Sequence, residues 1–491
     1  MTQSDQTPPI QFPAERRLFY AGAWHDPQGG YSDTFNPATG ESLGPAANAN
    51  AEDVQAAVAA AKSAFGAWRD TTPLERAERL RAIAGVVRQH IAELALLESA
   101  NNGNPVRAIA ANLQYAAQLI EYFAGLAVEL KGETLPGAPS AIRMTLREPI
   151  GVCARLVAYN HPVLFLASKF APAVAAGNSV IMKAPDQAPL SSLRLLELIG
   201  DLLPPGVLNL LTGGRECGAA LVEHPDIPMV TLIGGVETGR SIARASASRL
   251  KRVLLELGGK NALVVYPDAD LDAAAAAAVQ GMSFGWCGQS CGSTSRLFLH
   301  RDIHDAVVDR VVELARGFKP GLPTDPNTTM GALISREHLD RVLTYIDIGK
   351  AEGAKLVYGG ARPSDPTLAR GSFVEPTIFT EVTPRMRIAQ EEIFGPILSV
   401  LRWHEEGEML DQVNAVEYGL TASIFSRDLG AACRLARRID AGSIAINNIA
   451  FHALGSPFGG YKQSGIGREE CVEELHAFTQ TKTVNLGLES P

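Results

Sequence analysis

The segment GVCARLVAYNHPVLFLASKFAPAVAAGNSVIMKA, residues 151–184, decides the predicted fold. It begins with a short apolar stretch typical of a strand (151–159) and continues into a helical pattern (164–177) that ends at Gly177. A second apolar strand follows at 178–184. A strand, a helix and a strand in this order form a βαβ unit with two parallel strands. The segment therefore predicts an α/β protein.

The same alternation continues toward the C-terminus. A helix is predicted over 189–202, and short apolar strands over 206–213, 229–235, 252–259 and 261–267. After residue 291 come a strand at 294–300, a helix at 304–318, and strands at 422–426 and 443–447. Open sheets of this type bind ligands beyond the carboxyl ends of their strands. We therefore search for the site in the residues that follow each strand.

The flanking regions follow other patterns. The first 150 residues read as largely helical, with apolar residues at helical spacing over 51–68 and 71–94. The alanine run at 272–279 also predicts a helix. The tail at 481–488 alternates apolar and polar residues like an edge strand, which can pair with another subunit.

Composition narrows the class of protein. The chain has 491 residues, 46% hydrophobic and 20% charged, with a net charge of −9, which argues against nucleic acid or an anionic membrane as partner. The N-terminal residues lack the apolar core of a secretory signal. The longest apolar stretch, 156–177, is interrupted by Asn160, His161 and Lys169, so we expect no membrane span and a cytoplasmic protein.

The six cysteines raise a separate question, because Cys287 and Cys291 are only four residues apart. A metal pair, a disulfide and a nucleophile beside an unrelated neighbour are all conceivable. No second Cys or His pair with ligand spacing follows, so no metal site is predicted. A long chain without a secretory signal predicts reduced thiols. Cys291, in the stretch GQSCGS, is a candidate nucleophile.

Three other groups of residues have both a structural and a functional interpretation. Glu256 lies inside an apolar strand; it is either on an exposed face or a general base tuned by burial. Gly234, Gly235 and Gly239 form either a plain connection or a strand-to-helix turn that presents N–H groups to phosphates. The third group, Lys183 and Asp186, follows the strand at 178–184. The two residues are either a solvated pair in a loop or a lysine beside an acid that binds ribose hydroxyls.

Taken together, the motifs resemble the aldehyde dehydrogenase superfamily over nearly the whole chain. The matching segments, in chain order, are NPATGE (36–41), VAYNHP (157–162), LELGGK (255–260), GQSCGSTSR (288–296), EEIFGP (391–396) and SPFGGYKQSGIGRE (456–469). Each motif alone is moderately specific, but their number and order make a chance match improbable.

The resemblance implies roles for individual residues. Cys291 would be the nucleophile, Glu256 the general base and Asn160 the oxyanion-stabilising amide. The implied cofactor-binding residues are Lys183, Asp186, Gly234, Gly235, Gly239, Leu257, Glu392 and Phe394. The implied substrate-pocket residues are Phe165, Trp286, Cys287 and Phe458, although the aromatic residues have a core-packing interpretation too. Aromatic walls suit apolar or aromatic aldehydes, and also betaine aldehyde through cation–π contact.

The resemblance also implies an architecture. It comprises a Rossmann-like NAD-binding domain (1–127 and 150–257), a catalytic α/β domain (258–461) and a bridging β-element for oligomerisation (128–149 and 477–491). NAD is favoured over NADP, and a homodimer or homotetramer is expected.

Three residues depart from the common pattern of the superfamily. Gly235 stands where Ser is common, Asp186 where Glu is common and Ser168 where Trp is frequent. Two alternatives to a hydrolytic aldehyde dehydrogenase stay open: a CoA-acylating enzyme, and a non-catalytic relative with a binding role.

Overall fold

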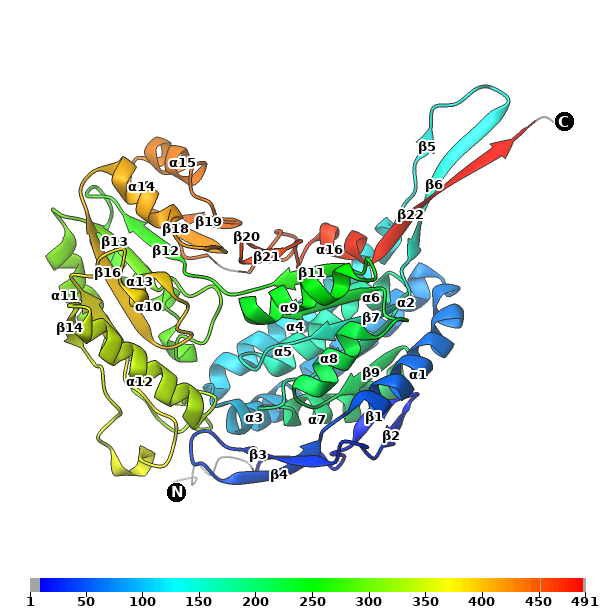
Figure 1. Ribbon diagram of the computed structural model, residues 1–491, viewed down its shortest axis with the longest axis horizontal. Helices are drawn as coiled ribbons and strands as arrows, with labels where there is room; N and C mark the ends of the chain where they lie inside the picture. The colour runs from blue at the N-terminus through cyan, green and yellow to red at the C-terminus, as the bar shows by residue number, and fades with distance from the viewer. Residues whose placement is uncertain (1–8, 451, 489–491) are drawn as a thin grey trace, which may run out of the picture.

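Two large sheets flanked by helices, with a narrow three-stranded arm, make up the fold (Figure 1). The computed structural model describes residues 9–450 and 452–488. Parallel strand pairs dominate both large sheets, which confirms the predicted α/β class. No helix within these two ranges is long and apolar enough to cross a membrane.

The first sheet has eight strands in the described chain and carries the βαβ unit of the deciding segment. Its strands, in spatial order, are β2 (Ala23–His25), β1 (Leu18–Tyr20), β9 (Leu208–Leu211), β8 (Ser179–Lys183), β7 (Val152–Leu156), β10 (Met229–Ile233), β11 (Arg252–Glu256) and β21 (Gly465–Ile466). From β7 the chain moves outward through β8 and β9, and then returns to β10 on the other side of β7. The crevice between β7 and β10 is therefore a topological switch point, where sheets of this kind bind ligands.

Helices cover this first sheet. They are α1 (Ala51–Arg69), α2 (Pro73–Gln89), α3 (Ile91–Asn102), α4 (Val106–Leu126), α5 (Pro162–Lys169), α6 (Ala171–Ala175), α7 (Leu190–Ile199), α8 (Arg215–Glu223), α9 (Val236–Ala247) and α16 (Val472–Ala477). The single helix expected over 164–177 is two helices, α5 and α6. Pro172 has no N–H for the carbonyl of Ser168, so the first helix cannot continue.

The N-terminal region is less uniformly helical than its pattern suggests. The helix expected over 71–94 stops at His90, where α3 begins in a new direction. Short strands precede α1: β1 pairs with β9 through Phe19 and Leu210, and β3 (Tyr31–Phe35) pairs with β4 (Ser42–Ala47). These strands have only three to six residues, too few for a clear alternating pattern, and β1 also depends on a partner, β9, that is distant in sequence.

The second sheet has seven strands in the described chain and lies beside the first (Figure 1). Its strands, in spatial order, are β14 (Lys355–Tyr358), β15 (Thr377–Thr380), β16 (Ile397–Trp403), β13 (Arg296–His300), β12 (Ala262–Val265), β18 (Thr421–Phe425) and β19 (Ser443–Ile446). Its helices are α10 (Leu271–Gly281), α11 (His304–Ala315), α12 (Arg336–Ala351), α13 (Arg387–Gln390), α14 (Glu406–Asn414) and α15 (Leu429–Ala436). Two short strands, β17 (Tyr418–Gly419) and β20 (Tyr461–Lys462), pair near its edge.

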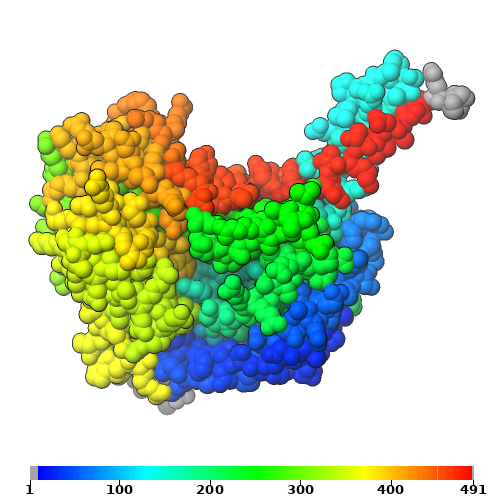
Figure 2. Space-filling view, viewed as in Figure 1, coloured from blue at the N-terminus to red at the C-terminus, as the bar shows by residue number. Residues whose placement is uncertain are grey.

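The arm consists of β5 (Thr134–Leu135), β6 (Ala141–Pro149) and β22 (Thr479–Gly487). Strand β22, which includes most of the tail expected to be an edge strand, pairs with β6 from Thr479 to Gly487. The arm projects from the body of the molecule (Figures 1 and 2). Its exposed apolar side chains include Ile142, Leu146 and Leu486.

Candidate active site

Two cavities meet at the switch point of the first sheet. The first, here called the glycine cavity, has a volume of about 390 Å³ and is lined by Gly234, Gly235 and Gly258 among others. The second, here called the aromatic cavity, has a volume of about 300 Å³ and is lined by Phe165, Trp286 and Phe458 among others. Both cavities share four lining residues: Asn160, Ile233, Glu256 and Cys291. The three catalytic candidates therefore lie at the junction.

Cys291 lies in the loop between the 3₁₀ turn η3 (Phe284–Trp286) and β13. Asn261 holds this loop, because its Nδ2 donates to the carbonyls of Cys291 (2.7 Å) and Ser293 (3.0 Å). Burial, together with the nearby carboxylates Glu392 and Glu256, raises the pKa of the Cys291 thiol to about 12. The thiol is therefore protonated at neutral pH and needs a proton acceptor to become a nucleophile.

Asn160 follows β7 and is almost fully buried. Its carbonyl accepts a hydrogen bond from Asn104 Nδ2 (2.9 Å), and its own Nδ2 donates to the carbonyl of Gln289 (3.0 Å). These bonds fix the amide against the loop that carries Cys291. One N–H of Nδ2 is left for a ligand, a geometry suited to a developing oxyanion.

Glu256 is the last residue of β11, and its carboxyl is buried rather than on an exposed face. Neither carboxyl oxygen has a hydrogen-bond partner in the described chain. Burial and the negative charge of Glu469 raise the pKa of Glu256 well above its usual value. A buried carboxyl without a hydrogen-bond partner, at the junction of two cavities, can accept a proton from a water molecule or a thiol and so act as a general base.

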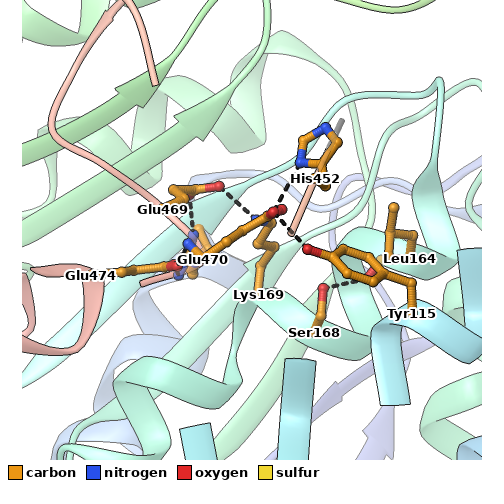
Figure 3. Close-up of polar contacts among 9 residues, drawn as sticks. Tyr115, Leu164, Ser168, Lys169, His452, Glu469, Glu470 and Glu474 are labelled. Atoms are coloured by element: carbon orange, nitrogen blue, oxygen red, sulfur yellow. Dashed lines mark hydrogen bonds and ion pairs between the residues drawn. The ribbon is translucent and has the colours of Figure 1, made fainter. Parts of the chain in front are cut away.

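A buried charge network borders the aromatic cavity, and the sequence analysis did not identify it. Lys169 Nζ lies 2.8 Å from Glu469 Oε2 and 3.2 Å from Glu470 Oε1. Arg155 pairs with Glu469 (2.5 Å) and Glu474 (3.0 Å). Figure 3 shows Lys169 with Glu469, Glu470 and Glu474 around it. The sequence does hold one sign of this network: Lys169 lies inside the apolar stretch 156–177, and a charge in such a stretch is buried only if it has partners of opposite charge.

The turn after β10 forms one wall of the glycine cavity. Gly234, Gly235 and Thr238 line it, and Gly235 is the N-cap of α9, where a side chain would meet open space. The N-terminus of α9 therefore presents its free N–H groups to the cavity. Gly239 and Leu257 serve packing: a Cβ at Gly239 would lie 2.6 Å from Leu257 Cδ1.

Glu392 and Phe394 form the opposite wall of the glycine cavity. The N–H of Gly259 donates to Glu392 Oε1 (3.1 Å), while burial raises the pKa of Glu392 to about 7. Phe394 has a left-handed backbone with φ of 60°, and its ring meets Tyr159 edge-on at 5.9 Å. Strained backbone held in this way is common at ligand sites.

Lys183 and Asp186 lie away from the glycine cavity. Asp186 lines a separate cavity of about 790 Å³ with Gly213 and Gly214, and a Cβ at Gly214 would lie 3.7 Å from Asp186 Oδ2. Lys183 ends β8; burial lowers the pKa of its ammonium group, and Asp186 partly opposes that effect. This larger cavity contains none of the three catalytic candidates, so size alone does not locate the chemistry.

The aromatic cavity differs from the expectation at one position. Cys287 does not line it: the side chain is buried in the core of the second sheet with Phe298. Ser168 does not line it either, because its hydroxyl donates to the carbonyl of Leu164 (2.7 Å) within α5. Both are packing residues, and the cavity is lined instead by polar side chains that the sequence analysis did not single out: Asn112, Tyr115, His161, His452 and Glu470.

The α/β fold thus places a thiol, a fixed amide and a buried carboxyl between a glycine-walled and an aromatic cavity. Residues 24–484 match the model of the aldehyde dehydrogenase family. The chain belongs to this family, and the resemblance drawn from the motifs is confirmed.

Known proteins similar to this chain include two described as aldehyde dehydrogenases. This chain is 51% identical to aldehyde dehydrogenase tropH of Talaromyces stipitatus, over 98% of this chain and 95% of that protein. A structure of a putative aldehyde dehydrogenase from Burkholderia cenocepacia is 41% identical, with a TM-score of 0.95 and coverage of 97% and 98%. A structure of PnpE from Pseudomonas sp. WBC-3 in complex with nicotinamide adenine dinucleotide is 40% identical, with a TM-score of 0.94 and the same coverage.

Proposed function

We propose that this chain is an NAD-dependent, hydrolytic aldehyde dehydrogenase that acts on mid-sized apolar or aromatic aldehydes. The observation that carries the proposal is the placement of Cys291, Asn160 and Glu256 on the wall shared by the two cavities. One cavity would receive the cofactor and the other the aldehyde, so that both meet at the thiol.

The glycine cavity fits a nicotinamide cofactor. Gly234 and Gly235 leave room beside the N-terminus of α9 for a phosphate, and the carboxyl of Glu392 has acceptor capacity for ribose hydroxyls. Asp186 is proposed to hold the adenine ribose and to disfavour the 2′-phosphate of NADP. When bound, NAD accepts the hydride that leaves the substrate carbon.

The first half of the reaction depends on Cys291 and Asn160. The proton of the Cys291 thiol moves to Glu256, whose raised pKa suits an acceptor, and the thiolate attacks the aldehyde carbon. The carbonyl oxygen becomes an oxyanion that accepts hydrogen bonds from Asn160 Nδ2 and the backbone N–H of Cys291. Loss of hydride from the resulting thiohemiacetal leaves a thioester on Cys291.

The second half depends on Glu256. Once Glu256 has released the thiol proton to solvent, its carboxylate takes a proton from a water molecule, and the resulting hydroxide attacks the thioester carbon. The carboxylic acid leaves, and the Cys291 thiolate regains a proton from Glu256. A CoA-acylating enzyme needs no such base. The unpartnered, buried carboxyl of Glu256 therefore favours hydrolysis over transfer to CoA, and over a non-catalytic role.

The size and walls of the aromatic cavity support the substrate class. About 300 Å³ is at the small end of ligand pockets and suits a guest of benzaldehyde size. Phe165 and Trp286 lie edge-on to His161, with ring centroids 5.6 and 4.5 Å apart, so the cavity offers aromatic surfaces for a ring. The same aromatic faces keep a quaternary ammonium aldehyde, such as betaine aldehyde, as a second candidate.

We further propose that the chain assembles through the arm. Strand β22 is the edge of its sheet, and Ile142, Leu146 and Leu486 are exposed on it and its neighbour β6. An edge strand beside exposed apolar residues supports pairing with a second copy. We also propose the domain boundaries that the resemblance implies: an NAD-binding domain (1–127 and 150–257), a catalytic domain (258–461) and a bridging element (128–149 and 477–491).

The test is NADH absorbance on mixing the purified protein with NAD and a panel of aldehydes. The panel contains acetaldehyde, hexanal, benzaldehyde and betaine aldehyde, with CoA added in a parallel series. We expect NADH to form fastest with benzaldehyde or hexanal and without CoA. A strict requirement for CoA, or a clear preference for acetaldehyde, would contradict the hydrolytic or the substrate part of the proposal respectively.

A further inference from the structure

Three polar side chains on one side of the aromatic cavity are joined by hydrogen bonds. Tyr115 comes from α4, His452 from the segment before β20, and Glu470 from the turn before α16. Tyr115 Oη donates to Glu470 Oε2 (2.9 Å), and His452 Nδ1 lies 2.9 Å from the same oxygen. All three residues line the cavity, and Figure 3 shows Glu470 between Lys169 and the two rings.

Glu470 is ionised, which fixes the direction of these hydrogen bonds. Burial raises the pKa of Glu470, but His452, Lys169 and the hydrogen bond from Tyr115 outweigh it and hold the pKa well below its usual value. A carboxylate only accepts, so both Tyr115 Oη and His452 Nδ1 must donate. Burial also raises the pKa of Tyr115, which keeps its phenol protonated.

The directions determine what the cavity wall offers to a ligand. Tyr115, having donated its hydrogen, still has oxygen lone pairs that accept. His452 donates from Nδ1, and its Nε2 is a second ring nitrogen that can form a hydrogen bond. His161 instead offers a donor. Its Nδ1 lies 2.9 Å from Asn112 Nδ2, an amide nitrogen that only donates, so Nδ1 must accept. The ring hydrogen of His161 is therefore on Nε2, which donates.

Burial keeps His161 in this neutral form, since it lowers the pKa of the ring to about 3. The wall therefore combines the acceptor of Tyr115, the donor of His161 and the second ring nitrogen of His452 beside the aromatic side chains of the cavity. An aldehyde that ends in a methyl group would leave these groups without partners, at the cost that unpaired polar groups carry. A hydroxyl group both donates and accepts, so it matches the set.

We infer that Tyr115, His452 and Glu470 form a hydroxyl-recognition site, which makes a ring-hydroxylated aromatic aldehyde the preferred substrate. This inference rests on the proposed function and names its substrate more closely. Tyr115 and His452 contact the hydroxyl, while Glu470 is a positioning residue that orients both.

The charges around the site disfavour ionic alternatives. A carboxylate on the far end of the aldehyde would meet the acceptor of Tyr115 and the negative Glu470. An ammonium group would meet Lys169, which lines the same cavity, and could not use the donor of His161. A neutral hydroxyl avoids both conflicts.

The experiment compares kcat/KM for pairs of aldehydes of matched size. The pairs are 3-hydroxybenzaldehyde with 3-methylbenzaldehyde, and 4-hydroxybenzaldehyde with 4-methylbenzaldehyde. For each variant, kcat/KM for the hydroxyl substrate is divided by kcat/KM for the methyl substrate, and this ratio is compared with the same ratio in the wild type. The comparison cancels the difference in intrinsic reactivity between the two aldehydes. For at least one pair, Tyr115→Phe and His452→Phe should each lower this ratio about three- to tenfold, the range of one neutral hydrogen bond.

Tyr122→Phe is the matched control, since Tyr122 also belongs to α4 but does not line the aromatic cavity. It should leave the ratio unchanged. His452→Phe alters an exposed side chain, so it keeps the test valid if Tyr115→Phe folds poorly.

Three results would overturn the inference while leaving aldehyde oxidation intact. They are unchanged ratios in both Tyr115→Phe and His452→Phe, an equal loss in Tyr122→Phe, or a wild-type preference for 4-formylbenzoate or an amino aldehyde over both hydroxybenzaldehydes. Absence of NADH with every aldehyde would overturn the proposed function as well, so the two failures are distinguishable.

Discussion

The glycine cavity and the aromatic cavity share one wall but are built in different ways. Backbone groups form much of the glycine cavity, where the turn at Gly234 and Gly235 precedes the N-terminus of α9. Side chains form the aromatic cavity, and they come from α4, α5, the Cys291 loop and the segment before α16. A backbone site recognises a ligand common to a whole family, whereas a side-chain site can change with each member.

A carboxyl group in each cavity makes the contrast concrete. Glu392, in the glycine cavity, receives one backbone hydrogen bond, and burial raises its pKa to about 7. Glu470, in the aromatic cavity, is more fully buried, but its three side-chain partners keep its pKa low. Burial therefore neutralises a carboxyl only where partners are few, and partners determine which of the two stays charged.

The largest effect concerns the wall that both cavities share. Cys291→Ala should abolish NADH production, because no thiohemiacetal can form, while NAD should still bind. Cys287→Ala is the matched control and should keep most activity, since Cys287 is buried outside both cavities. Steady-state NADH absorbance and NAD titration by protein fluorescence give the two readouts. The opposite pattern in the two variants would assign the nucleophile to Cys287.

A smaller effect separates the two halves of the reaction. Glu256→Gln keeps size and packing but removes the basic carboxylate, so the thioester should accumulate. Turnover should fall about 10²–10⁴-fold, the usual span for a general base. Rapid mixing should show a burst of NADH near one per active site, and intact-protein mass should show an acyl adduct on Cys291. If Glu256 also deprotonates the thiol, the burst itself slows. Wild-type turnover without an adduct would remove Glu256 from the mechanism.

The next effect lies at the outer end of the cofactor site. Asp186→Ser removes the carboxylate proposed to repel a 2′-phosphate, so the ratio of kcat/KM for NADP to that for NAD should rise about 10–10²-fold. Gln187→Ser, a neutral change at the adjacent exposed position, is the control. Equal kcat/KM values for the two cofactors in the wild type would show that Asp186 does not discriminate.

The smallest effect follows from the raised pKa of Glu392. A protonated carboxyl loses acceptor capacity for ribose hydroxyls, so NAD should bind more weakly as pH falls through about 7. The dissociation constant should rise about tenfold from pH 8 to pH 6, if only the ionised form binds. Calorimetric titration at several pH values measures it, and Glu392→Gln should flatten the profile. A flat wild-type profile would exclude this role for Glu392.

The same contrast explains what the sequence could predict. The strands at 151–159 and 178–184, the glycine turn and the position of Cys291 follow local patterns, so the fold class and family were accessible. The network of Lys169, Glu469 and Glu470 was not, because it joins segments about 300 residues apart. Burial of Cys287 was also hidden, since a loop cysteine has no periodicity that reveals its direction.

The most direct test of the shared wall is a crystal structure of Cys291→Ala with NAD and 4-hydroxybenzaldehyde. The variant cannot turn over, so both ligands can be seen together. We expect the nicotinamide in the glycine cavity, the aromatic ring in the aromatic cavity, and the aldehyde oxygen within hydrogen-bond distance of Asn160 Nδ2. Both ligands in one cavity, or an aldehyde oxygen directed away from Asn160, would contradict the account.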